Sequence, residues 1–521
     1  MKCLFPYEHD IPTTMLDILP VFQKRWLDNG TIKKWDGPFK DIFSPVMERS
    51  PAGLAGRMIG RVPWMDENAS RNALKLALKA FSNGRGEWPT MPIEERVERF
   101  ESFLAGMIEA RDRIVGLIQW EIGKSRQDAG EEFDRTVRYV RDCFNVFRQL
   151  PGRSSSLVTG NGVTGRLMRV PAGIALIMGP FNYPFFETMT AFIPAMLAGN
   201  TAIIKPPRLG CLFFEPLLDL FQRFFPAGSV NIIYGDGKTI VPVLMRSGSV
   251  SILYFIGTST VAAYLKGCHP KQHRLKCILG LEAKNPAVVL PDADLDITVK
   301  ESVRGALAFN GQRCAALKIF FVHRSIAGEF NERFRETLAD LRCGMPWEDD
   351  VFITPLAEPA RTGYLSGLIE DAKVQGAKVI NEGGGDVCGS FFQPSILYPV
   401  APGMRIYEEE QFGPIVPVVP FDDVEEFVRY VTESNYGQQA SVFGKDRRAL
   451  REMTRFLVHQ VSRVNINSQC QRSPDTVPFT GRKDSAEGCL SIGKTVDAFT
   501  LPVFVAKKTG EVVDIPDELM G

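Results

Sequence analysis

Short apolar segments that alternate with helical segments dominate the chain after residue 170. Strands are predicted at 174–178, 201–204 and 251–255, and helices are predicted between them at 187–197 and 213–225. Strands that are buried on both faces and joined by helices form parallel sheets. The alternation therefore predicts an α/β fold, and such sheets bind ligands at the carboxyl ends of their strands.

Cys314 lies in a second block of this alternation, after a predicted helix at 295–310 and before a predicted strand at 319–322. A thiolate is the reactive form of cysteine, and the neighbouring cation Arg313 is expected to favour it. Gly311 lets a ligand approach the backbone closely. Cys314 is therefore a candidate nucleophile, although a single cysteine is more often a small buried apolar residue.

The chain before these blocks has a different pattern. Apolar residues recur at three- and four-residue spacing in 68–86 and 93–149, which predicts helices. Within them, most of the charged run at 128–137 is expected to be a solvated helix face. Residues 1–66, with many Pro and Gly, are expected to be irregular and to wrap the surface. A hairpin is predicted at 154–170.

Charge and cysteine usage exclude several functions. Lys plus Arg and Asp plus Glu are both 61, so no global field attracts nucleic acid or an acidic membrane. No stretch reaches the ~20 apolar residues of a membrane span, and the first residues do not resemble a secretory signal.

The scattered cysteines predict reduced thiols in the cytoplasm. A cluster of Cys268, His269, His273 and Cys277 matches no zinc-site spacing, so no metal is expected.

Five motifs, in order, resemble the aldehyde dehydrogenase superfamily. They lie at 178–184, 205–207, 257–259, 311–314 and 410–414, and the likeness runs from about residue 67 to residue 508. The motif at 257–259 follows a strand and opens a helix, where free N–H groups suit a pyrophosphate. The resemblance implies a Rossmann-type cofactor domain, an α/β catalytic domain and a β arm for oligomerisation.

The resemblance also gives the expected domain boundaries. The NADP-binding domain would comprise 1–152 and 171–283, and the catalytic domain 284–480. The arm and C-terminal tail would comprise 153–170 and 481–521. An extended segment at 498–506 would be an aggregation hazard if it were unpaired, so it is expected to pair with another chain or domain. The oligomerisation arm that the resemblance implies predicts a homodimer or homotetramer.

By the same resemblance, Cys314 attacks an aldehyde, and Asn182 with the backbone N–H of Cys314 stabilises the oxyanion. Hydride then leaves for a nicotinamide, and the thioester that remains is hydrolysed. Arg208 replaces a Glu that NAD-preferring relatives often carry, which predicts NADP. The implied cofactor-binding residues are Lys205, Arg208, Gly257, Thr258, Ser259, Glu410 and Phe412.

Within the superfamily, the chain most resembles the NADP-dependent, non-phosphorylating glyceraldehyde-3-phosphate dehydrogenases. That likeness implies that Arg135, Tyr183, Arg313 and Arg472 grip a substrate phosphate, so glyceraldehyde 3-phosphate is the expected aldehyde. Planar guanidinium groups suit phosphate oxygens better than amines do.

One departure from the family concerns hydrolysis. The usual Glu-Leu-Gly-Gly-Lys is replaced by residues 280–284, so Gly280 stands where the deacylating Glu is expected and Glu282 follows two residues later. Glu282 is the predicted replacement base. The alternative is that Glu282 pairs with a neighbouring Lys or backbone amide and only shapes the loop. Two alternatives stay open: a coenzyme-A-acylating or other-substrate aldehyde dehydrogenase, and a non-catalytic paralogue.

Overall fold

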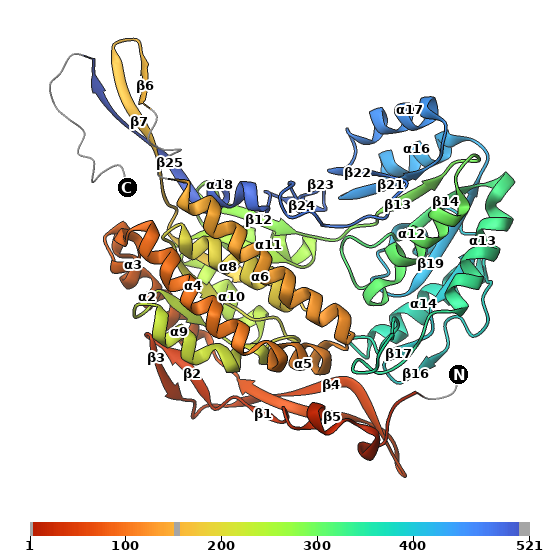
Figure 1. Cartoon of the computed structure of the whole chain (residues 1–521), viewed down its shortest axis with the longest axis horizontal. Coiled ribbons are helices and arrows are strands. Elements are labelled where there is room, and N and C mark those ends of the chain that lie inside the picture. The colour runs from red at the N-terminus through yellow and green to blue at the C-terminus, as the bar shows by residue number, and fades with distance from the viewer. Residues whose placement is uncertain (1–3, 151–156, 510–521) are drawn as a thin grey trace.

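The chain folds into two α/β blocks, each with a mainly parallel sheet, and a β arm extends from one of them (Figure 1). The structure is a computed structural model that describes residues 4–150 and 157–509. The predicted α/β class is confirmed. No helix in these two ranges is long and apolar enough to cross a membrane.

The first sheet has six strands in the order β10-β9-β8-β11-β12-β24, and only β24 runs antiparallel to its neighbour. The chain passes from β8 to β9 on one side and later to β11 on the other side. This reversal next to β8 creates the crevice in which α/β sheets bind ligands. The strands are β8 (Ile174–Met178), β9 (Thr201–Ile204), β10 (Val230–Ile232), β11 (Val250–Ile256), β12 (Lys276–Gly280) and β24 (Ala486–Glu487).

Helices cover both faces of this sheet, and α8 is buried along its whole length. Its first turn is favourable for a helix because Pro184 occupies the first helical position. The predicted helix at 213–225 is instead a 3-10 segment at Leu212–Leu217 followed by α9, because Pro216 interrupts it. The helices of this block are α2 (Glu67–Phe81), α3 (Glu87–Thr90), α4 (Ile93–Glu109), α5 (Arg111–Ile122), α6 (Arg126–Arg148), α8 (Pro184–Leu197), α9 (Leu218–Phe224), α10 (Gly237–Arg246) and α11 (Ser259–Cys268).

The second sheet has seven strands in the order β15-β18-β19-β14-β13-β21-β22, parallel except for β15. Its strands are β13 (Pro286–Val289), β14 (Ile319–His323), β15 (Lys378–Val379), β18 (Ser395–Tyr398), β19 (Ile415–Phe421), β21 (Gln439–Phe443) and β22 (Arg463–Ile466). Its helices are α12 (Leu295–Leu307), α13 (Arg324–Ala339), α14 (Arg361–Val374), α15 (Arg405–Glu408), α16 (Val424–Glu433) and α17 (Arg447–Leu457).

The prediction that residues 1–66 are irregular is wrong. This segment forms a long hairpin that runs along the first block (Figure 1), together with a shorter one. Register breaks after Ile42 and after Phe43, with several glycines, hide the period of two that marks a strand. The elements are α1 (Thr13–Leu16), β1 (Val21–Phe22), β2 (Arg25–Asp28), β3 (Thr31–Lys34), β4 (Phe39–Ser50) and β5 (Gly53–Pro63).

The arm is a three-stranded sheet of β6 (Leu157–Gly160), β7 (Val163–Pro171) and β25 (Thr500–Lys508). The turn residues Asn161 and Gly162 both have positive φ, as a tight hairpin requires, so the predicted hairpin is confirmed from residue 157 onward. Residues 154–156 of that prediction, like 510–521 of the predicted tail, lie outside the described residues. The C-terminal strand β25 pairs with β7 of the same chain, within the predicted arm, and not with another chain or domain as expected.

Candidate active site

Cys314 lies where two cavities meet between the two α/β blocks. One cavity has a volume of about 530 Å³ and the other about 410 Å³, and Tyr183, Glu187, Cys314 and Phe479 line both. The half-buried Cys314 can therefore meet one ligand from each cavity. The 530 Å³ cavity is called the arginine cavity below, and the 410 Å³ cavity the loop cavity.

A tight turn delivers Cys314 to this junction. After α12 ends, Phe309, Asn310 and Gly311 all have positive φ. A Cβ at Gly311 would stand 2.7 Å from the Gly413 carbonyl oxygen, so only glycine fits there. Asn285 Nδ2 donates to the Cys314 carbonyl oxygen at 2.7 Å and so fixes the end of the turn at Cys314.

Burial is the main influence on the Cys314 thiol and raises its pKa, and the charge of Glu187 raises it further. Lys318, Arg472 and a hydrogen bond from Gln438 act in the opposite direction. Arg313 instead donates to the carbonyl oxygens of Arg304 and Gly305, at 3.2 and 2.8 Å. The cations that favour the thiolate are thus Lys318 and Arg472, and the expectation that Arg313 has this role is corrected.

Asn182 approaches the same turn from the first block. Its Nδ2 donates to the Gln312 carbonyl oxygen at 2.8 Å, two residues before Cys314. The Asn182 loop is held by Lys124, whose Nζ donates to the Asn182 carbonyl oxygen at 2.9 Å and to Glu132 at 2.6 Å. The Lys124 ammonium also lies 3.5 Å from the centre of the Tyr183 ring. Asn182 therefore lies at the turn that carries Cys314 and lines the loop cavity with it, and its role in stabilising the oxyanion stays a prediction.

Glu132 anchors this arrangement, although it belongs to the charged run that was expected to be mainly solvated. It is 2% exposed, and its Oε1 accepts from the backbone N–H groups of Phe185 and Phe186 at 3.0 Å each. The expectation of a solvated face is thus wrong for Glu132. Glu132 lies three residues after Ala129 and four before Thr136, on the buried face of α6. This helical spacing is the sequence signal that could have predicted its burial.

The loop cavity gathers the predicted cofactor residues. Lys205, Arg208, Gly257, Thr258, Glu410 and Phe412 all line it. Burial lowers the pKa of Lys205, and Arg208 pairs with Glu358 at 2.6 Å near the surface. Glu410 pairs with Lys318 and also accepts from the Ala283 N–H at 3.3 Å.

Ser259 does not itself line the loop cavity, but its N–H donates to Glu282 Oε2 at 2.7 Å. Thr258 caps the same α11 N-terminus by accepting from the Val261 N–H. A carboxylate therefore already binds where the sequence places a pyrophosphate, so these donors suit an anion. The prediction that Glu282 is the hydrolytic base stays a prediction, and in this structure its carboxylate is engaged at α11.

The arginine cavity brings together all the predicted phosphate ligands, namely Arg135, Tyr183, Arg313 and Arg472. Two of the arginines already have acidic partners. Arg135 makes two hydrogen bonds to Asp475 at 2.6 and 2.8 Å, and Arg472 pairs with Glu187. Among the described residues, Arg472 Nη2 and Arg313 Nε are buried without a hydrogen-bond partner. These two donors can serve a further anion.

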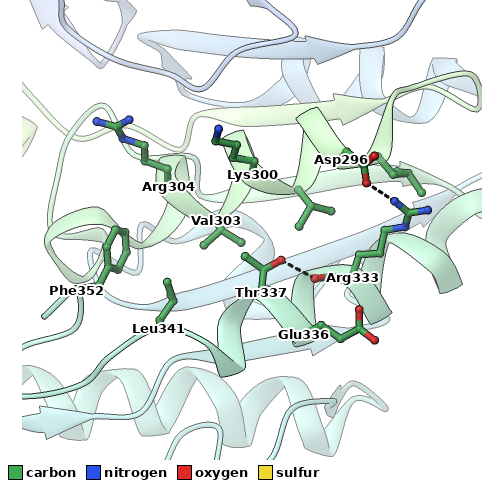
Figure 2. Close-up of a pocket in the computed structure, with 11 residues that line it drawn as sticks. Asp296, Lys300, Val303, Arg304, Arg333, Glu336, Thr337, Leu341 and Phe352 are labelled. Carbon is green, nitrogen blue, oxygen red and sulfur yellow. Dashed lines mark hydrogen bonds and ion pairs between the residues drawn. The ribbon is translucent and has the colours of Figure 1, made fainter. Parts of the chain in front are cut away.

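A further hollow of about 530 Å³ lies between α12 and α13 (Figure 2). Among its charged side chains, Arg333 and Asp296 pair with each other at the end of the hollow shown in Figure 2. No cysteine, serine or histidine lines it. It offers no thiol, so the chemistry is assigned to the junction at Cys314.

The comparisons with known proteins agree with this geometry. The chain matches the aldehyde dehydrogenase family over residues 44–505. It is 31% identical to the NADP-dependent glyceraldehyde-3-phosphate dehydrogenase of Pisum sativum, over 83% of this chain and 86% of that protein. It is 27% identical to malonate-semialdehyde dehydrogenase 2 of Shouchella clausii, over 88% of this chain and 94% of that protein.

A solved structure is similar over almost the whole chain. The NADP-dependent glyceraldehyde-3-phosphate dehydrogenase of Bacillus halodurans, complexed with NADP, superposes with a TM-score of 0.85 at 28% identity. The match covers 94% of this chain and 99% of that one. The five motifs, the fold and these matches lead to one conclusion: the chain belongs to the aldehyde dehydrogenase family.

Proposed function

We propose that the chain oxidises glyceraldehyde 3-phosphate to 3-phosphoglycerate with NADP, through a thioester on Cys314. The observation that carries the proposal is the pair of buried, unpartnered guanidinium donors, Arg472 Nη2 and Arg313 Nε, in the cavity that opens on Cys314. Guanidinium donors of this kind suit phosphate oxygens. The relatives with glyceraldehyde-3-phosphate dehydrogenase activity in their names support the same substrate.

The residues at the junction divide the chemistry between them. The thiolate of Cys314 bonds to the aldehyde carbon, and the oxygen that becomes negative is met by Asn182 Nδ2 and the Cys314 N–H. One such donor typically contributes about 3–4 kcal/mol to the transition state. Buried Lys318 and Arg472 favour the thiolate before the attack. Cys314→Ser should therefore bind cofactor but lose nearly all oxidation.

NADP fits the loop cavity by the chemistry of its donors. Lys205 offers an ammonium to ribose hydroxyls, and the N-terminus of α11 accepts an anion at the Ser259 N–H. Arg208 lines the same cavity and can exchange Glu358 for a 2′-phosphate. When bound, the cofactor accepts hydride from the carbon that is attached to Cys314.

A single assay tests the proposal and its alternatives. NADPH formation is followed by absorbance with glyceraldehyde 3-phosphate, with malonate semialdehyde and without aldehyde, each in the presence and absence of coenzyme A. Steady turnover of the phosphorylated aldehyde without coenzyme A supports the proposal. Gly280 favours the second candidate, a coenzyme-A-acylating dehydrogenase, which would turn over only when coenzyme A is added. Absence of NADPH with every aldehyde would identify a non-catalytic paralogue.

We further propose a homodimer or homotetramer that assembles through the arm and works in the cytoplasm. The arm exposes apolar side chains that pairing with a second copy would cover, namely Val158, Leu167, Leu501, Val503 and Phe504. No cysteine among the described residues forms a disulfide with another described cysteine, which suits a reducing compartment. Light scattering of the purified protein measures the assembly directly.

A further inference from the structure

Gly280 leaves the active site without the carboxylate that its family uses for hydrolysis. It ends β12, pairs with Ile256 on one side and Ala486 on the other, and lines the loop cavity together with Cys314. A thioester on Cys314 would therefore meet no acidic side chain from this position. Glu282, the base predicted from the sequence, has its carboxylate engaged by the Ser259 N–H at the start of α11. If turnover proceeds without coenzyme A and Glu282 stays there, another group must take the proton of the attacking water.

Glu187 is a buried carboxylate in contact with both cavities that open on Cys314. It lies in the first turn of α8, five residues after Asn182, and is 6% exposed. Tyr254 donates its hydroxyl hydrogen to Glu187 Oε2 at 2.9 Å, and Arg472 binds Oε1. The carboxylate is therefore held in one position. Glu187 and Cys314 line the same two cavities, and the charge of Glu187 contributes to the raised pKa of Cys314.

A cavity of about 30 Å³ lies against Gly280 on the side of Glu187. A polar cavity of roughly 10–15 Å³ is already sufficient for one water molecule. Gln438 lines this cavity, is 3% exposed, and its Oε1 has no hydrogen-bond partner among the described residues. Tyr254 and Arg472 also line it, beside apolar residues such as Ile278, Leu279 and Leu490. The space beside Gly280 thus has room for a water molecule, with Glu187 and Gln438 as acceptors, and the same three residues also line the loop cavity with Cys314.

We propose that Glu187 is the base that hydrolyses the Cys314 thioester, acting on a water held between Glu187, Gln438 and Gly280. This inference rests on the proposed oxidation of an aldehyde. The water oxygen bonds to the thioester carbonyl carbon while its proton moves to the Glu187 carboxylate. The carbon–sulfur bond then breaks, Cys314 leaves with the electron pair as a thiolate, and the acid product departs.

The test compares wild type with Glu187→Gln in rapid-mixing experiments that follow NADPH. Gln keeps the size of the side chain and still accepts a hydrogen bond from Arg472. The variant should give a burst of NADPH stoichiometric with enzyme, followed by steady turnover reduced by ~10²–10⁴, the usual worth of general base catalysis. Intact-protein mass spectrometry should detect the acylated enzyme, and Cys314 should carry the added mass.

Two further variants keep the test decisive if Glu187→Gln folds poorly. Tyr254→Phe retains the carboxylate and its Arg472 pair, and should slow deacylation about two- to tenfold, as expected for one lost hydrogen bond, without reducing the burst. Glu187→Gln combined with Gly280→Glu returns a carboxylate to the family position and should restore steady turnover. The three atoms nearest to a Cβ at Gly280 belong to the Ile256 side chain, the closest at 3.3 Å, so a shift of a few tenths of an ångström in that side chain makes room for the Cβ.

The outcomes separate this inference from the proposed function. Unchanged steady turnover in Glu187→Gln would show that Glu187 is not the base. Loss of the burst together with the turnover would also overturn its role in hydrolysis, because acylation itself would then depend on Glu187. Neither result contradicts oxidation of the aldehyde by the wild-type enzyme. Failure of Gly280→Glu to restore turnover while the burst persists would also count against it. A wild-type enzyme that gives only a burst until coenzyme A is added would instead refute hydrolysis altogether.

Discussion

Replacing Lys124 with Met should loosen the loop that carries Asn182 and lower both stability and the rate of acylation. Lys124 and Glu132 are fully buried as a pair, with 2.6 Å between Nζ and Oε2. Lys124 also binds the Asn182 carbonyl oxygen, and Glu132 binds the N–H groups that begin α8. Methionine has a similar length but leaves the Glu132 charge buried without its cation.

The size of the effect follows from this burial. Removing one partner of a buried ion pair typically costs about 3–5 kcal/mol. At roughly 2 °C for each kcal/mol in a large domain, the midpoint of thermal unfolding should fall by about 6–10 °C. The maximal rate of NADPH formation should also fall, because Asn182 no longer has a fixed position next to the oxyanion.

Lys266→Met is the matched control, since Lys266 pairs with Glu487 at the surface. An exposed pair is worth ~0–1 kcal/mol, so this variant should keep its unfolding midpoint within about 2 °C of wild type. Differential scanning fluorimetry and burst kinetics measure both variants. Equal shifts for Lys124→Met and Lys266→Met would show that the buried pair does not hold the loop.

Three further predictions concern substrate, cofactor and thiol. Arg472→Ala should raise the KM for glyceraldehyde 3-phosphate roughly 10- to 150-fold, the equivalent of ~1.5–3 kcal/mol, far more than the KM for an unphosphorylated aldehyde; equal changes would make the arginine structural. Arg208→Glu should shift the ratio of kcat/KM values from NADP toward NAD, and an unaltered ratio would mean that Arg208 serves only its surface pair with Glu358. Because burial raises the pKa of Cys314, iodoacetamide alkylation of the apo-enzyme at this residue should reach half its maximal rate above pH 9.0, the ordinary value; a midpoint below that value would contradict the burial argument.

The α/β fold could be predicted because its signal is local. Strands such as β8 and β9 are short, wholly buried and rich in apolar residues, and β8 is followed by the 14-residue helix α8. The N-terminal hairpin gave no such signal, since β4 and β5 mix exposed and buried residues without a regular period. Their stability comes from contact with the first block, and a sequence pattern carries little information about such contacts.

The site could be predicted only as far as its motifs extend. Asn182 and the loop at 257–259 are predictable because each lies in a motif that follows a strand, and Cys314 is predictable because its motif lies in the turn between a helix and a strand. Glu187 was missed because its partners Tyr254 and Arg472 are 67 and 285 residues away in the chain. The partners of Arg313 were mistaken for a similar reason, since its neighbour in sequence is not the group that its guanidinium binds.

Two arginines of the arginine cavity are already paired with carboxylates, and this limits how strongly the cavity can bind a substrate phosphate. Arg135, Arg313 and Arg472 bring three positive charges to the arginine cavity, and Glu187 and Asp475 neutralise two of them. A phosphate of about two negative charges at neutral pH must therefore share its arginines with carboxylates. Because Arg472 keeps Nη2 free while Nη1 holds Glu187, one guanidinium can bind the substrate anion and fix the carboxylate at the same time. Phosphate affinity is thereby reduced relative to a site with unpaired arginines, and in return a carboxylate stays fixed beside Cys314, where Gly280 supplies none.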